Sequence, residues 1–141
     1  MTSTTGLSLG QVHALLARRQ YSVQEVNESV LNIREVETGI SLSAVLEGDI
    51  LFLSLVCMVI PEGSLTPEMM RKMLAGDNGI STSHFQIYNA GNGRVAVTLN
   101  NFCKLQDLGA EDEDDILSCV SFLLADVVHA KELIGTDLSL S

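Results

Sequence analysis

The sequence is poor in aromatic residues and in positive charge. It has no Trp and only 4% aromatic residues, so a stacking surface for bases or sugars would have little to draw on. Eight Lys and Arg residues stand against 18 Asp and Glu residues, which gives a formal net charge of −10. Nucleic-acid binding depends on neutralising phosphates, and anionic membranes recruit clusters of Lys and Arg. The composition therefore argues against both kinds of partner.

Cysteines and long hydrophobic runs are also scarce. The three cysteines, Cys57, Cys103 and Cys119, are odd in number and have no CxxC spacing. We expect buried, reduced thiols and a cytoplasmic setting, since the first ten residues carry neither Lys or Arg nor an apolar run. The most apolar segment, Ile50 to Ile60, is far shorter than the ~20 residues that span a membrane.

No catalytic, cofactor-binding or metal-binding residues are predicted. His13, His84 and His129 are far apart and lack any ligand spacing, and no Ser-rich or Gly-rich elbow frames a cysteine nucleophile. The Gly91-Asn92-Gly93 stretch lacks the third glycine of a dinucleotide fingerprint and joins two expected strands, so a hairpin turn explains it. We therefore expect a protein that is not an enzyme.

The acidic run from Glu111 to Asp115 has three interpretations. Carboxylates in the first turn of a helix interact favourably with the helix dipole, so a solvated helix start accounts for the run. A docking surface for a basic partner and a divalent-cation site remain open alternatives, although the oxygen pattern and central glycine of a calcium loop are missing.

The first half of the chain predicts one helix and then strands. Ser8 and Gln11 form a capping box before an amphipathic helix, Leu9 to Arg19. Residues Val30 to Val36 are read as a strand, although their apolar spacing also suits a helix. Alternation from Ile40 to Leu46, the turn residues Glu47-Gly48-Asp49 and the run Ile50 to Ile60 indicate a hairpin.

The second half predicts a short helix, a hairpin and a long helix. Thr66 and Pro67 are typical of a helix start, and that helix runs to Leu74, with Gly76 as its stop. Strands His84 to Tyr88 and Arg94 to Leu99 follow, then an amphipathic helix that Gly135 should end. We predict one α+β domain over residues 1–141, with an antiparallel sheet of about five strands and flexible tails at 1–7 and 136–141.

The long strand and the middle helix carry the functional hypothesis. The strand is apolar on both faces, one of which holds Leu51, Leu53 and Leu55, so each face needs a cover. With few helices available, we expect another molecule to cover one face, and Leu51, Leu53 and Leu55 are candidate residues of that dimer or partner interface. Met69, Met70 and Met73 form the apolar stripe of the middle helix, together with Leu74. Such a stripe is either core or an adaptable interface.

The order of these elements from Ile40 to Ile134, the small size and the acidity resemble the type III secretion chaperone-like fold. Uncharacterised bacterial proteins of the YjfI and YbjN types are similar too. The resemblance implies a homodimer with Met69, Met70, Met73 and Leu74 at the two-fold axis, and a partner polypeptide on the uncovered face of the long strand. It implies a dimeric chaperone or adaptor without cofactors. The alternative is a regulatory or stress-response protein of the same fold that has no secreted client.

Overall fold

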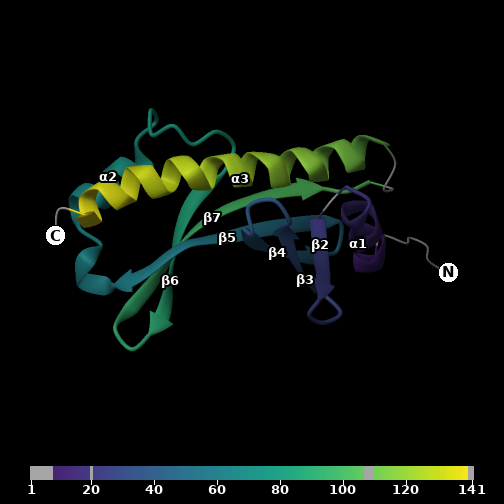
Figure 1. The fold of residues 1–141 in the computed structure, drawn as a ribbon, viewed down its shortest axis with the longest axis horizontal. Coiled ribbons are helices and arrows are strands. Elements are labelled where there is room, and N and C mark those ends of the chain that lie inside the picture. The colour runs from purple at the N-terminus through teal and green to yellow at the C-terminus, as the bar shows by residue number, and fades with distance from the viewer. Residues whose placement is uncertain (1–7, 20, 107–109, 140–141) are drawn as a thin grey trace. The chain divides into compact units, whose positions relative to one another are not determined.

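The computed structural model describes residues 8–19, 21–106 and 110–139. Its antiparallel sheet has the strand order β2-β3-β4-β5-β7-β6, and helices precede, interrupt and follow the strands in the chain (Figure 1). The elements are α1 (Leu9–Ala17), β2 (Tyr21–Glu25), β3 (Val30–Glu35), β4 (Ser41–Glu47), β5 (Ile50–Pro61), η1 (Glu62–Ser64), α2 (Pro67–Leu74), β6 (His84–Gly91), β7 (Arg94–Lys104) and α3 (Ala110–Ser139). This confirms the predicted α+β class.

The chain divides into two compact units. The first unit comprises Met1–Ser54 and Asn101–Ser121, and the second comprises Leu55–Asn100 and Phe122–Ser141. Strands β5 and β7 and helix α3 contribute residues to both.

In the first unit, local signals start the helix and one sheet face becomes core. The Ser8 side chain accepts from the Gln11 N–H, and the Gln11 side chain accepts from the Ser8 N–H, so the predicted capping box is confirmed. Helix α1 contacts β2 and β3. Side chains alternate between the two faces of a strand, and the fully buried residues of β3, β4 and the start of β5 all lie on one face. They are Leu31, Ile33, Leu42, Ala44, Leu51 and Leu53.

The second unit has its own hydrophobic cluster around α2. Thr66 caps this helix by accepting from the Met69 N–H, and Pro67 occupies its first turn, as predicted. The cluster joins α2 to β5, β7 and the end of α3 through Ile60, Met69, Met73, Val95, Val97 and Ile134. Met58, Leu65 and Phe85 pack against it. The short helix is therefore held by tertiary packing, which helices of this length require.

The inside–outside alternation of β5 slips by one residue near its end. Leu55 and Cys57 are buried, and the next buried residue is Ile60 rather than Val59. The Val59 carbonyl accepts from the Arg94 guanidinium at 3.2 Å, and Val59 itself is 39% exposed. The slip lets Ile60 join the cluster around α2, which a strict alternation would not allow.

The strand count and the end of the last helix differ from the prediction. Tyr21–Glu25 is a sixth strand beside the predicted five or so, and its ladder with β3 stabilises it. Helix α3 also continues past Gly135 to Ser139. A glycine inside a helix costs about 1 kcal/mol relative to alanine but does not by itself end the helix. The tail predicted at 1–7 lies outside the described residues, as do residues 140 and 141 of the tail predicted at 136–141, whereas residues 136–139 belong to α3.

Candidate partner-binding surfaces

The sheet face opposite the core of the first unit carries one row of apolar side chains. Val30 pairs with Val45, and Val45 pairs with Phe52. The ring of Phe52 lies beside that of Phe102, with centroids 6.2 Å apart and an interplanar angle of 40°. Phe52 is 39% and Phe102 is 56% exposed, whereas both valines are half-buried. These four residues, which we call the open-face row, cross four strands.

The row is bordered by polar residues on the same face. The next set of paired residues along these strands is Asn32, Ser43 and Ser54. These polar side chains form the border of the row on one side. Exposed apolar surface of this kind, rimmed by polar residues, is typical of an interaction site.

The three leucines predicted for the interface lie on the opposite face. Leu51, Leu53 and Leu55 are 0%, 1% and 2% exposed, so their own chain encloses them. The same strand presents Phe52 and Val56 to solvent, at 39% and 54% exposure. The sequence left open which face of the strand binds a partner, and the Phe52 face is the one that keeps exposed apolar side chains.

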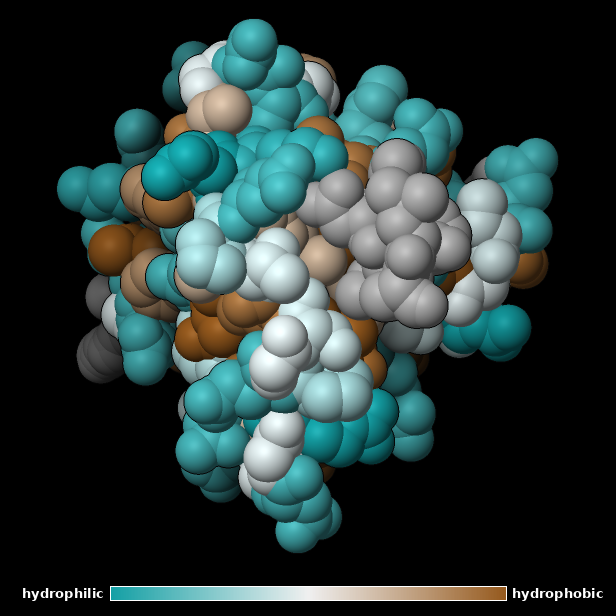
Figure 2. All heavy atoms as spheres, turned by 90° about the vertical axis from the view of Figure 1, so that its left-hand side faces the viewer, coloured by the Kyte–Doolittle hydropathy of each residue, from teal (hydrophilic) through white to brown (hydrophobic). Residues whose placement is uncertain are grey.

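The predicted interface residues of α2 lie partly in the core and partly at the surface. Met69 and Met73 are 2% and 4% exposed within the cluster of the second unit, so the core interpretation applies to them. Met70 is half-buried and Leu74 is 81% exposed. Figure 2 shows the side of the molecule on which α2 lies in Figure 1. On that side, hydrophobic residues reach the surface between hydrophilic ones. Of the four predicted helix residues, Met70 and Leu74 can offer surface to a second copy.

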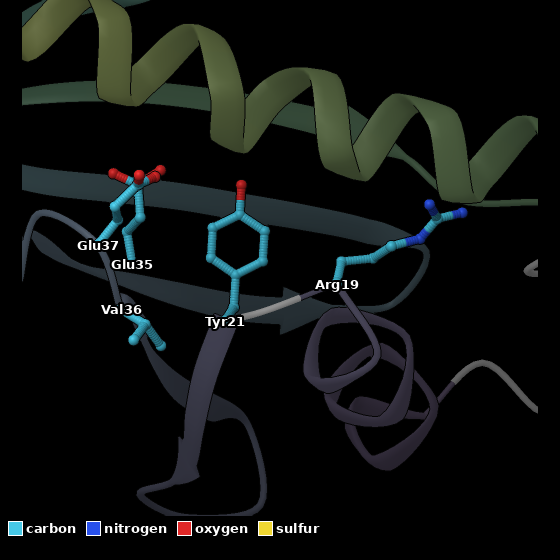
Figure 3. A pocket seen from close by; sticks show the side chains of 5 residues that line it. All are labelled: Arg19, Tyr21, Glu35, Val36 and Glu37. Atoms are coloured by element: carbon cyan, nitrogen blue, oxygen red, sulfur yellow. The ribbon is translucent and has the colours of Figure 1, made fainter.

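A hollow of about 480 Å³ lies in the first unit, lined by Arg19, Tyr21, Glu35, Val36 and Glu37. Figure 3 shows the Tyr21 hydroxyl and the carboxylates of Glu35 and Glu37 pointing the same way. Burial raises the pKa of Tyr21, and the charge of Glu35 raises it further. The Arg19 guanidinium is bound to Glu113 at 2.7 Å, so it is not free to neutralise both carboxylates. The hollow brings two carboxylates together, and among its described lining residues no nucleophile is paired with a base.

Two acids of the acidic run and one histidine bind other residues of the chain. The buried Asp112 carboxylate accepts from the Gln106 N–H at 2.7 Å, and Glu113 binds Arg19. His13 lies 2.8 Å from Glu25, which links α1 to the end of β2. Within residues 8–19, 21–106 and 110–139, no three His, Cys, Asp or Glu side chains are grouped to hold a metal ion. No helix in that part of the chain is long and apolar enough to cross a membrane.

The comparisons with known proteins identify a fold and no sequence family. The sequence matches no protein-family model and no curated protein. The fold is secretion chaperone-like, as the resemblance predicted.

Two solved structures share this fold. One is YbjN from E. coli, described as a candidate transcription regulator, with a TM-score of 0.67 and 11% identity over 89% of this chain and 93% of that one. The other belongs to the heterodimeric ExoU–SpcU complex of the Pseudomonas aeruginosa type III secretion system. Its TM-score is 0.60, with 15% identity over 85% of this chain and 94% of that one.

Proposed function

We propose that this chain is a non-enzymatic protein-binding protein, a dimeric chaperone or adaptor that holds a segment of a partner polypeptide in the cytoplasm. The observation that carries the proposal is the open-face row. It exposes two phenylalanine rings on a sheet face that the described residues leave partly open. Apolar side chains of a partner segment can pack on such a row without a fixed sequence.

Two further features support the proposal. The net charge of −10 keeps a protein with exposed apolar residues soluble. The fold is shared with a protein of the ExoU–SpcU complex, in which two different polypeptides associate. The predicted homodimer would use Met70 and Leu74, the helix residues that retain exposed surface.

A second candidate is a regulatory protein of the same fold that acts through folded partners. The similarity to YbjN, which is described as a candidate transcription regulator, favours this alternative. A regulator of this kind has no need to hold an unfolded segment, so the two candidates differ in their affinity for an unfolded chain.

The decisive experiment measures the binding of reduced, carboxymethylated α-lactalbumin, which stays unfolded, by fluorescence anisotropy. The variant Phe52→Ser/Phe102→Ser removes both rings of the open-face row. Fully burying a phenylalanine is worth about 1.5–3 kcal/mol, and these rings are roughly half exposed, so their loss should cost about 2 kcal/mol of binding free energy. That corresponds to a dissociation constant weakened about 30-fold.

The matched control is Val26→Ser/Val36→Ser, which removes exposed apolar residues of the same unit outside the row. We expect it to bind like the wild type, and circular dichroism should show both variants folded. Wild-type protein that does not bind the unfolded chain would refute the chaperone role and favour the regulator. Light scattering should give twice 15.2 kDa for the proposed homodimer, and a monomer would remove that part of the proposal.

A further inference from the structure

Two of the three cysteines lie in contact within the first unit. Cys103 is in β7 and Cys119 is in α3. The two thiols lie within hydrogen-bond reach of each other. The Cys119 sulfur also lies 3.6 Å from the carbonyl oxygen of Phe102, the residue before Cys103. Strand β7 and helix α3 therefore place the two sulfurs next to each other.

The two thiols differ in access and in acidity. Cys103 is 7% exposed, whereas Cys119 is half-buried. The hydrogen bond from Cys103 lowers the pKa of Cys119, although burial and Asp115 oppose the shift. The same bond, together with burial, raises the pKa of Cys103. Cys119 is thus the thiol that ionises first and meets solvent, which is typical of an oxidisable cysteine beside a second one.

We propose that Cys103 and Cys119 are a modification site for hydrogen peroxide, which converts the pair to an intramolecular disulfide. The Cys119 thiolate attacks one peroxide oxygen, the O–O bond breaks, and a sulfenic acid and hydroxide result. The Cys103 sulfur then attacks the Cys119 sulfur. The S–O bond breaks, the Cys103 proton leaves with the hydroxyl group as water, and the S–S bond forms. Two thiols and one peroxide give one disulfide and two waters.

The geometry favours this product over further oxidation. The two thiols are already neighbours, and the disulfide requires their sulfurs to approach to ~2.05 Å. The disulfide would link β7 to α3 and close a loop that runs from Cys103 to Cys119. A cross-link of this kind restricts the unfolded chain, so the oxidised protein should unfold at a higher temperature than the reduced one.

The third cysteine provides the matched control. Cys57 lies in the second unit and is 8% exposed, and burial raises its pKa to about 11. Under native conditions it should therefore resist peroxide, so Cys57→Ser should behave like the wild type.

The test treats the full-length protein with hydrogen peroxide at neutral pH and maps the products by mass spectrometry. We expect a loss of two hydrogen atoms and one cross-linked peptide pair that contains Cys103 and Cys119, in the wild type and in Cys57→Ser. Cys103→Ser should accumulate a sulfenic acid at Cys119 that dimedone traps, and Cys119→Ser should oxidise several-fold more slowly.

Denatured protein should lose the preference for the Cys103–Cys119 pair. A disulfide that includes Cys57, a disulfide between molecules, or sulfinic acid at Cys119 without a disulfide would overturn the proposal. The wild-type peptide map decides the outcome even where a variant does not fold.

Discussion

Two serines in one loop should change stability in opposite directions when replaced by alanine. The Ser81 hydroxyl donates to the Asp126 carboxylate, at 2.9 Å from Oδ1 and 3.0 Å from Oδ2, and Asp126 is only 2% exposed. The Ser83 hydroxyl is buried and has no hydrogen-bond partner among the described residues. A hydrogen bond to a charged group contributes about 1.5–3 kcal/mol, and an unpaired buried hydroxyl costs about 1–3 kcal/mol. We therefore expect Ser81→Ala to lose about 2 kcal/mol and Ser83→Ala to gain about 1 kcal/mol.

Urea unfolding followed by far-UV circular dichroism measures both changes. Each variant should keep the wild-type m-value, so that a shift of the midpoint reports stability alone. The backbone N–H of Ser81 still donates to Asp126 at 3.0 Å in either variant, which keeps the loop in place. A Ser83→Ala variant that loses more than about 1 kcal/mol would show that its hydroxyl is satisfied, and would refute the reasoning.

Two further predictions concern α2 and the start of α3. Met73→Ala should lower the free energy of unfolding in urea by about 2–5 kcal/mol, because Met73 is 4% exposed in its cluster. Leu74→Ala is the control: Leu74 is 81% exposed, so the free energy of unfolding should change by less than about 0.5 kcal/mol. Equal losses in the two variants would show that α2 packs differently. The hydrogen bond from Arg19 lowers the pKa of Glu113. Glu113 therefore stabilises the fold at a pH above its pKa in the unfolded chain, and this contribution is lost as the pH falls through its pKa in the folded chain. In Arg19→Gln an NMR titration should find the Glu113 pKa raised toward 4.5, and an unchanged pKa would contradict the assignment.

Local signals made much of the fold predictable. The capping box at Ser8 and the Thr66–Pro67 start depend on residues within one helical turn, so the sequence alone locates both helix starts. The hairpin between β4 and β5 was predictable for the same reason. Its Gly48 adopts a φ of +61°, which glycine tolerates better than other residues.

Tertiary packing decided what the sequence could not show. Strand β2 is stable because it pairs with β3, and no pattern within its five residues reports that pairing. The methionine stripe of α2 is the same whether it faces a core or a partner, and only its contacts with Ile60 and Val97 distinguish the two. Phe102 was missed as a surface residue because its ring partner, Phe52, is distant in the sequence.

The width of the open-face row limits the kind of partner that fits it. Permanent homodimer interfaces bury large, predominantly apolar surfaces. Here the apolar surface of the row is limited on one side, since Asn32, Ser43 and Ser54 replace apolar residues at the next paired positions. A single segment packed along the row would bury both phenylalanine rings and leave the polar border solvated, which suits reversible binding. A homodimer contact would therefore have to use other residues, of which Leu74 is the most exposed large apolar side chain among the described residues.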